Sequence, residues 1–356
     1  MSPTGAEDVG EEGGGERELK SRLGQTFSLT EMAEEVELCF PLLANTSCRR
    51  TPRPRSVVVG ATLLLSVMSL LTVILNLLLI ISICHFRRLQ TTTNLLLLSL
   101  ASSDFFVGFF MLSQIFLLDG CWLFGDLMCA LLYLLDHMIT SASIGSMVLI
   151  SVERYVAVCD PLRYQVRVTK RRVGVSIVLC WSLSSVFNVA CSIDTLQRPG
   201  SAISCVGECL VIVSPAAGLA DLFLSFVGPI FVIVVLNMRV FVVAAFQARA
   251  ERSRVAVVTA RPSHGPKSSE LRAARTLGVV VVVFVACIMP YFCVVISGQD
   301  VTLNASSAAV IICLFYSNSC LNPLIYAIFY PWFRRSIKLV VTLRIVQPDS
   351  SRTDLL

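Results

Sequence analysis

Three acidic residues stand inside long hydrophobic stretches of this chain, and they are the side chains there best able to do chemistry. They are Asp104, Asp136 and Asp221, and no Lys or Arg lies deep enough in those stretches to pair with any of them. A carboxylate in a low-dielectric environment either takes up a proton or gains a cation. The three acids therefore predict ion or ligand sites rather than neutral packing positions.

Two of the acids are expected at one depth, near the outer end of the helices. Asp136 and Arg154 are eighteen residues apart on one predicted helix. A helix rises roughly 27 Å over that separation, nearly the whole thickness of the hydrocarbon core. With Arg154 at the cytoplasmic face, Asp136 lies near the outer mouth. Asp221 precedes Pro229 by eight residues, a little over two helical turns toward the outside, so it lies near the depth of Asp136.

The third acid is expected to bind a small inorganic cation. Asp104 falls below the outer third of its stretch, where Ser143, Asn318, Ser319 and Asn322 can surround it with neutral oxygen groups. Hard oxygen ligands suit an ion such as sodium. We therefore expect a sodium ion as an allosteric ligand, no other metal and no organic cofactor.

The composition places these acids in a membrane protein. Of the 356 residues, 55% are hydrophobic and 15% charged, and the mean hydropathy is +0.76, too apolar for a water-soluble globule of this size. Seven stretches are long enough to cross a bilayer as helices: residues 57–83, 93–118, 127–152, 173–192, 213–237, 277–297 and 305–329. The sequence therefore predicts an all-α integral membrane protein, a bundle of seven transmembrane helices.

Basic residues predict the orientation. The links after the first, third and fifth stretches carry two, six and eight Lys and Arg residues, with Arg154 and Arg239 counted. Such links face the cytoplasm. Four basic residues before the first stretch contradict this orientation, namely Arg49, Arg50, Arg53 and Arg55. All the other links agree with it, so we keep it. We expect a multi-pass protein of the plasma membrane with an extracellular N-terminus.

The chain divides into three parts. Residues 1–55 are expected to be an extracellular segment, largely disordered, residues 56–330 the seven-helix domain, and residues 331–356 an amphipathic helix with a cytoplasmic tail. In the last part Phe333 and Ile337 recur at helical spacing opposite Arg334, a pattern typical of a helix lying on the inner leaflet. The net charge of +5 comes from the cytoplasmic loops, which predicts contact with anionic membrane lipids and not with nucleic acid.

Landmarks along all seven stretches give a resemblance to a known superfamily. The chain resembles a rhodopsin-like (class A) G-protein-coupled receptor over about residues 57–343. The landmarks, in chain order, are Asn76, Leu100, Asp104, Cys129, Glu153, Arg154, Tyr155, Trp181, Pro229, Phe284, Cys287, Pro290, Asn322, Pro323 and Tyr326.

A second group of motifs narrows the resemblance to the trace amine-associated receptors. The run from Asn318 to Phe333, with Tyr330 and Trp332 beyond the usual terminus, is similar to the fingerprint of that family. Shorter agreements occur at residues 37–41, 45–48, 121–125 and 205–209. These motifs cover less of the chain than the superfamily match but discriminate better.

The resemblance implies a receptor for volatile or biogenic amines. Asp136 matches the position that holds the ligand's ammonium group in amine receptors, and Tyr291, Phe292 and Tyr316 fall where the pocket wall and floor lie. Asp221 faces the same pocket. A diamine between Asp136 and Asp221 removes the repulsion of two facing carboxylates. A monoamine on Asp136 alone is the milder alternative.

In that family one loop cysteine bonds to the top of the third span and another to the N-terminus. By this resemblance we expect Cys129 to pair with Cys209, and Cys205 to pair with either Cys39 or Cys48. The sequence does not decide between the last two. Asn45, in Asn45-Thr46-Ser47, is a glycosylation acceptor on the extracellular side.

The resemblance also implies the route to the cytoplasm. Ile144, Pro229 and Phe284 match a packed switch below the pocket, and Arg154 is expected to pair with Glu270 in the inactive state. A further group completes the coupling machinery, namely Glu153, Tyr155, Pro323 and Tyr326. The implied partners are a heterotrimeric G protein, of the stimulatory type that raises cyclic AMP, and arrestin.

Two positions depart from the family pattern. The usual Trp after the span-six cysteine is Ile288, and the usual Tyr near the inner end of span five is Asn237. Asn237 is too short to reach Tyr326 as a phenol does, so we expect unusual signalling efficiency or basal activity.

Other classes of protein fit the sequence less well. Buried acids also suit an ion-coupled amine transporter, but the chain has no detectable internal repeat. An enzyme is not expected, because no nucleophile is evidently paired with a base.

Overall fold

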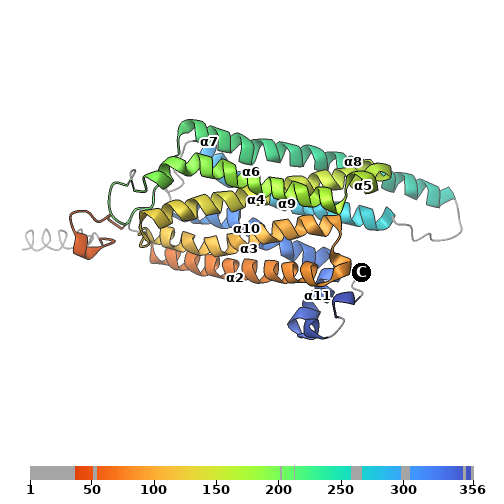
Figure 1. Ribbon diagram of the computed structural model, residues 1–356, viewed down its shortest axis with the longest axis horizontal. Coiled ribbons are helices and arrows are strands. Elements are labelled where there is room, and N and C mark those ends of the chain that lie inside the picture. Colours follow the sequence, from red (N-terminus) through yellow and green to blue (C-terminus); the bar gives the residue numbers. More distant parts are fainter. Residues whose placement is uncertain are drawn as a thin grey trace, which may run out of the picture.

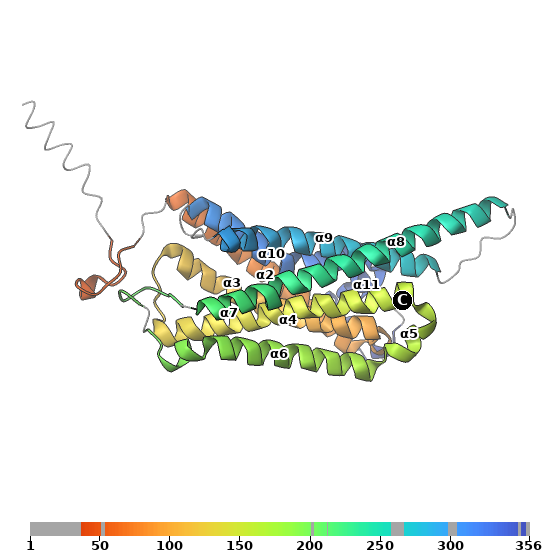
Figure 2. The same ribbon diagram turned by 90° about the horizontal axis from the view of Figure 1, so that it is seen from above.

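The computed structural model is an elongated bundle of membrane-length helices. It describes residues 37–50, 54–200, 203–211, 213–257, 267–297, 305–347 and 350–353. Figures 1 and 2 show the long helices running side by side along the bundle axis, with the N-terminal segment at one end. The bundle helices are α2 (Arg55–His85), α3 (Thr92–Asp119), α4 (Gly125–Cys159), α6 (Lys170–Gln197), α7 (Pro215–Asp221) continued by α8 (Gly228–Val257), α9 (Lys267–Ser297) and α10 (Ala305–Phe329).

The apolar character of the helices fits a lipid environment. Within the described part of the chain, six helices are long and apolar enough to cross a membrane, and α9 adds the shorter apolar segment Gly278–Val294. Leucines on the outer surface are widely exposed, as Leu63 on α2 shows at 62%. Such helices have no polar outer face, because lipid rather than water covers them. The prediction of an all-α, seven-helix membrane bundle is confirmed.

Local sequence sets where the helices begin. Thr91 and Thr169 accept hydrogen bonds from the backbone N–H groups of Asn94 and Arg172, which caps α3 and α6. Ser214 caps α7 in the same way and Pro215 follows it at the first helical position. At the other end of α3, Gly120 has φ +83°, a left-handed conformation that glycine adopts without strain.

Several helices run beyond their predicted spans, as the third and the fifth show. The third was expected at residues 127–152 but α4 extends to Cys159, and the fifth was expected at 213–237 but α8 extends to Val257. Figure 2 shows α8 projecting past the other helices. Hydropathy detects only the lipid-facing part, whereas Ala, Arg and Glu also favour helix after the chain leaves the membrane.

A π-helical turn interrupts the fifth span directly below Asp221. It covers Leu222–Val227 (η3) between α7 and α8. Such turns shift the facing of the residues above them and are frequent at functional sites. The sequence analysis predicted one regular helix here, because the apolar pattern of this segment carries no break.

In the described part of the chain, three disulfides stabilise the end of the bundle that adjoins the N-terminal segment. They join Cys129 to Cys209, Cys48 to Cys205, and Cys39 to Cys121. The first was expected. The second resolves the open choice in favour of Cys48, and the third was missed.

The opposite end of the bundle carries two short helices. They are α5 (Pro161–Arg167), in the link after α4, and α11 (Pro331–Val341), which turns away from the bundle axis after α10 (Figure 1). Phe333 and Trp332 of α11 are buried, whereas Arg334 and Arg335 are exposed. This helix is amphipathic as predicted, although part of its apolar face packs on α2 rather than on lipid.

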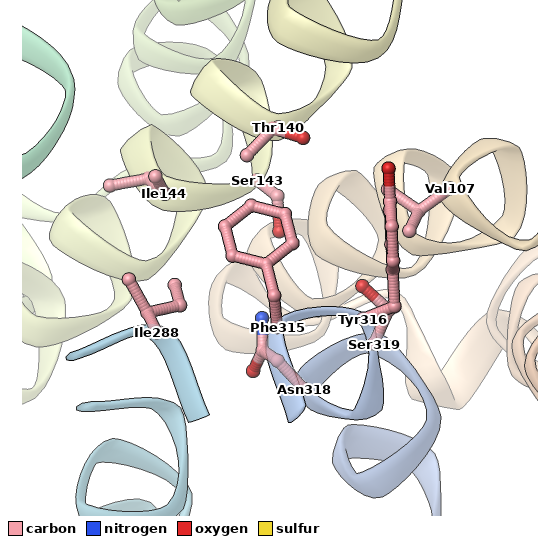
Figure 3. A pocket seen from close by; sticks show the side chains of 9 residues that line it. All are labelled: Val107, Thr140, Ser143, Ile144, Ile288, Phe315, Tyr316, Asn318 and Ser319. Atoms are coloured by element: carbon pink, nitrogen blue, oxygen red, sulfur yellow. The ribbon is translucent and has the colours of Figure 1, made fainter. Parts of the chain in front are cut away.

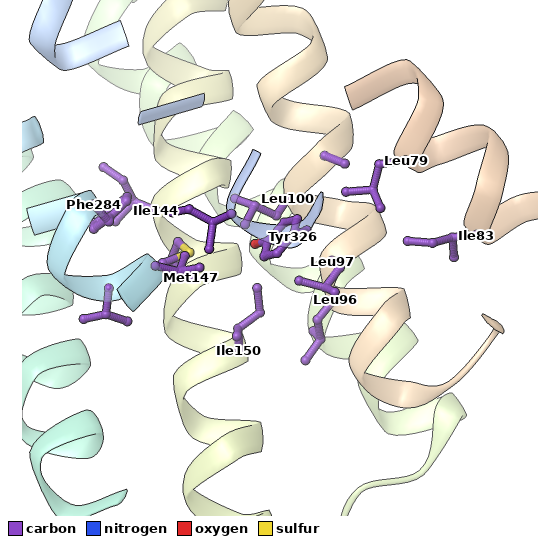
Figure 4. Close-up of a cluster of buried hydrophobic side chains, with 14 of the residues drawn as sticks. Leu79, Ile83, Leu96, Leu97, Leu100, Ile144, Met147, Ile150, Phe284 and Tyr326 are labelled. Atoms are coloured by element: carbon purple, nitrogen blue, oxygen red, sulfur yellow. The ribbon is translucent and has the colours of Figure 1, made fainter. Parts of the chain in front are cut away.

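The main apolar core lies in the half of the bundle that adjoins α11. Figure 4 shows side chains of α2, α3, α4, α9 and α10 meeting there, with Phe284 of α9 facing Ile144 and Met147 of α4. Phe284 and Met147 are fully buried. Close packing of this kind favours discrete arrangements over continuous deformation.

Candidate functional site

The upper part of the site is a carboxylate held by one phenol. The Tyr316 hydroxyl on α10 donates a hydrogen bond of 3.1 Å to Oδ2 of Asp136 on α4. Oδ1 of Asp136 is buried and has no hydrogen-bond partner in the described part of the chain. A buried carboxylate oxygen without a donor is costly and marks a place where a cationic donor is favourable.

Asp221 belongs to the same region. The phenol groups of Tyr133 and Tyr291 each interact electrostatically with both Asp136 and Asp221. Asp221 is half-buried at the end of α7. The structure therefore places both predicted carboxylates within electrostatic range of the same two tyrosines.

An aromatic row closes the site. Phe226 stacks on Phe292 with ring centroids 3.7 Å apart, and Tyr291 meets Phe292 edge-on at 5.3 Å. The row continues from Tyr291 to Phe315 and from Phe315 to Tyr316, at 4.8 and 5.3 Å. Aromatic faces so placed offer cation–π contacts to an ammonium group. The expected wall and floor residues Tyr291, Phe292 and Tyr316 all lie in this row.

A small cavity lies directly below. Its volume is about 20 Å³, and its walls come from α3, α4, α9 and α10, as Figure 3 shows. The lining residues are Val107, Thr140, Ser143, Ile144, Ile288, Phe315, Tyr316, Asn318 and Ser319. This space suits one water molecule or a small ion, and it separates the Asp136 level from the Asp104 level.

The lower acid has the neutral donors that were predicted, with one exception. Asp104 is fully buried, and Ser143, Ser319 and Asn322 donate to it at 3.2, 2.9 and 2.9 Å. Asn318 makes no such bond. It lines the cavity instead, and its Oδ1 is buried without a partner, as is Oδ1 of Asn322.

These oxygens are of the chemical type that binds a sodium ion. Asp104 supplies a hard anionic oxygen, and Asn318 and Asn322 have acceptor oxygens without donors. Because the Asp104 carboxylate already accepts three hydrogen bonds, an ion here would share it with the existing network.

At the end of the bundle opposite the disulfides, the buried Glu153 accepts hydrogen bonds from several elements. Arg154 bonds both oxygens of Glu153, at 2.5 and 2.6 Å, and also bonds the Thr93 hydroxyl. Thr93 and Tyr164 donate to Glu153 at 2.9 and 2.6 Å. Burial raises the pKa of the Tyr164 phenol and the hydrogen bond to Glu153 raises it further, so the hydroxyl keeps its proton and acts as a donor.

The expected partner of Arg154 was Glu270. The side chain of Glu270 is outside the described residues, so its pairing with Arg154 stays a prediction. Tyr155, which follows Arg154, is half-buried. The bonds from Thr93 and Tyr164 to Glu153 were not predicted. Thr93 lies in the first turn of α3 and Tyr164 in the short helix of the following link, and no periodic signal marks either position.

The predicted switch residues occupy the core between these levels. Ile144 and Phe284 share the main apolar cluster, together with Ile288 and Tyr326. Pro229 lies one residue into α8, directly below the π-helical turn, and Pro323 lies inside α10. The Tyr326 hydroxyl is buried without a partner in the described part of the chain.

Asn237, which departs from the family pattern, makes two specific hydrogen bonds. Asn237 Nδ2 donates to the Ser151 hydroxyl at 2.9 Å and to the Ile233 carbonyl at 2.7 Å. Asn237 therefore ties α8 to α4 one turn from Arg154, rather than reaching toward Tyr326.

Two site residues were missed but had usable signals. Tyr133 precedes Asp136 by three residues, and positions three apart share a helix face. Cys121 was among six extracellular or near-surface cysteines. The expected pairs use four of these, so the two left over point to a third bond.

The fold and the site together define a class. A seven-helix bundle with a cation-seeking carboxylate near one end, a packed core in the middle and a buried Glu–Arg pair at the other end is the arrangement of a membrane receptor.

Comparison with known proteins agrees with this class. Residues 75–326 match the family described as 7 transmembrane receptor (rhodopsin family). The chain is 36% identical over 334 residues to trace amine-associated receptor 4 of Mus musculus, covering 90% of this chain and 96% of the relative. It is 35% identical over 330 residues to trace amine-associated receptor 13c of Danio rerio, with the same coverage. Trace amine-associated receptor 1 of Mus musculus is 37% identical over 333 residues, covering 90% of this chain and 99% of the relative.

The chain therefore belongs to the rhodopsin family of seven-transmembrane receptors and, within it, to the trace amine-associated receptors. It is a multi-pass membrane protein and a receptor rather than an enzyme. Its partners are a small-molecule ligand and a G protein.

Proposed function

We propose that this receptor binds a diamine between Asp136 and Asp221 and signals through the stimulatory G protein, which raises cyclic AMP. The N-terminus faces the outside of the plasma membrane, where volatile or biogenic amines arrive. The names of its relatives support an amine as the ligand.

One observation supports a diamine as the ligand. Asp136 has a buried oxygen without a donor, and Asp221 interacts with the same two tyrosines, Tyr133 and Tyr291. Two carboxylates in one apolar pocket repel each other, and a dication removes both the repulsion and the missing hydrogen bond. A monocation satisfies Asp136 alone and leaves Asp221 uncompensated.

The test compares two ligands that differ by one ammonium group. We expect 1,5-diaminopentane to raise cyclic AMP in cells expressing the receptor at a concentration at least about tenfold lower than pentylamine does, because a second buried charge pair is worth more than 1.4 kcal/mol. The Asp221→Asn variant should lose this preference by weakening the diamine only. The Asp136→Asn variant should lose both responses.

A matched control uses an aspartate outside the site. Asp126 is exposed in the first turn of α4, so Asp126→Asn should leave both dose–response curves in place. If Asp221→Asn leaves the diamine response unchanged while Asp136→Asn abolishes it, the two-anchor proposal is wrong. The ligand is then a monoamine held by Asp136 alone.

An ion-coupled transporter is the alternative from another class. Uptake of radiolabelled 1,5-diaminopentane into cells, dependent on a sodium gradient and abolished by Asp104→Asn, would favour it. We expect binding without net uptake.

Several further features belong to the same proposal. Sodium at Asp104, Ser143, Asn318 and Asn322 acts as an allosteric ligand, and Asn45, which is exposed, carries a glycan. Arrestin binds the activated cytoplasmic face, and membrane lipids contact the exposed basic residues of α11. Separation of α9 from α4 exposes Arg154 and Tyr155 to the G protein.

A further inference from the structure

Phe315 lies at the junction between the amine site and the core. It is half-buried on α10, and its ring contacts the rings of Tyr291 and Tyr316 at 4.8 and 5.3 Å. Tyr316 holds Asp136, and Tyr291 interacts with both carboxylates. Any amine that reorients these two phenols therefore also acts on the Phe315 ring.

The other side of the ring faces the switch residues. Phe315 lines the cavity together with Ile144 and Ile288, and in Figure 3 its ring projects from α10 toward α4. It packs against the main core that contains Phe284, and also against a second buried cluster that contains Val107 and Tyr316. Phe315 thus joins the apolar cluster at the ligand level to the apolar cluster below it.

The space available at position 288 explains why this ring can lie there. Ile288 is 2% exposed, and the cavity between it and Phe315 holds only about 20 Å³. A bulky aromatic side chain at position 288 would need far more volume than that cavity provides, so it would collide with Phe315 or displace it. The short aliphatic residue on α9 and the aromatic residue on α10 fit each other.

We propose that Phe315 is the positioning residue that transmits amine binding from Asp136 to Ile144 and Phe284. The aromatic ring at this place comes from α10, because position 288 of α9 is aliphatic. This inference rests on the proposed amine function. Ligand binding displaces the tyrosines, the Phe315 ring moves against Ile288 and Ile144, and the packed core shifts to its second arrangement.

The shared space is tested without any ligand. We would measure thermal unfolding of the purified receptor for Ile288→Trp, Phe315→Ala and the double variant. Ile288→Trp overpacks the site and Phe315→Ala leaves a cavity, so each should lower the Tm by roughly 5 °C. The double variant should recover most of this loss, because the indole fills the space left by the phenyl ring.

A matched control separates shared space from general fragility. Phe109 is 49% exposed on α3, so combining Phe109→Ala with Ile288→Trp should give additive losses. Additive losses in the Phe315 cycle as well would overturn the inference, whether or not an amine activates the receptor.

The transmission role is tested with 1,5-diaminopentane. In Phe315→Leu we expect the Kd to stay within about threefold of the wild-type value while the maximal cyclic AMP response falls about tenfold, a coupling loss in the usual range. A parallel loss of affinity would show that Phe315 is only a ligand contact and would overturn the role. If the wild-type receptor neither binds nor answers any amine, the proposed function fails and this role fails with it. The unfolding cycle then still reports separately on the shared space.

Discussion

Tyr316 holds Asp136 by one oxygen and leaves the other free. Its hydroxyl donates to Oδ2 at 3.1 Å, while Oδ1 is buried without a partner in the described residues. The phenol thus fixes the direction of the carboxylate across the gap between α10 and α4. This oxygen is available to a donor that the described part of the protein does not supply.

Removing this phenol should weaken amine binding without removing the charge. In Tyr316→Phe, Asp136 loses its single donor and its orientation, and a hydrogen bond to a charged group contributes about 1.5–3 kcal/mol. We expect the EC50 for 1,5-diaminopentane to rise at least about tenfold. The measurement is a cyclic AMP dose–response curve at matched surface expression. An unchanged EC50 would mean that Asp136 does not depend on Tyr316 for its position.

The three disulfides predict how far the Tm of the receptor falls when single cysteines and pairs of cysteines are replaced. Cys39→Ser and Cys121→Ser should each lower the Tm of the purified receptor, because the bond restricts the unfolded chain over 82 residues. The double variant should be no less stable than the worse single variant, since both remove the same bond.

A double variant that removes one cysteine from each of two different disulfides provides the control. Cys39→Ser combined with Cys48→Ser breaks two different bonds, 39–121 and 48–205, so its losses should approach the sum. Additive losses in Cys39→Ser/Cys121→Ser would contradict the pairing. Mass spectrometry of an unreduced digest would then identify the true partners.

Sodium should stabilise the receptor through Asp104. We expect the Tm of the wild-type protein to be higher in sodium chloride than in choline chloride at equal ionic strength, because ligand binding to the folded state stabilises it. Asp104→Asn removes the anionic oxygen and should abolish the difference. Asp126→Asn, on the exposed first turn of α4, should keep it. A sodium effect that survives in Asp104→Asn would place the ion elsewhere.

Much of the fold was predictable from the chain because the membrane imposes simple rules. Apolar stretches of sufficient length identified the helices, and the absence of basic partners identified Asp104, Asp136 and Asp221 as unusual. The donors to Asp104 were predicted from two other helices, and Ser143 of α4 and Ser319 and Asn322 of α10 do bond it.

Other features depend on contacts that no local pattern encodes. The π-helical turn after Asp221 has an ordinary apolar sequence, and the choice between Cys39 and Cys48 depends on how the N-terminal segment folds over the loop. The contact from Tyr164 to Glu153 joins a short helix in a link to the end of α4. Such pairings follow from the assembled bundle, so composition and periodicity do not reveal them.

The hydrogen bond from Asn237 to Ser151 should restrain the receptor at rest. It ties α8 to α4 at 2.9 Å, three residues before Arg154, while the buried Tyr326 hydroxyl has no partner in the described residues. Asn237→Leu keeps the approximate size but removes the donor, which costs about 1 kcal/mol if the bond exists mainly in the resting arrangement. We therefore expect basal cyclic AMP to rise about fivefold.

The partner variant makes this prediction specific. Ser151→Ala removes the acceptor of the same bond and should raise basal cyclic AMP to a similar extent. Asn237→Leu/Ser151→Ala should rise no further than either single variant, because contacting residues act non-additively when one bond is lost. Ser176, which bonds only its own helix backbone, supplies the control Ser176→Ala with basal activity unchanged. If both single variants instead lower basal activity, the prediction is wrong and the bond stabilises the active arrangement. Asn237 would then support activation as the usual Tyr at this position does, but through Ser151 rather than Tyr326.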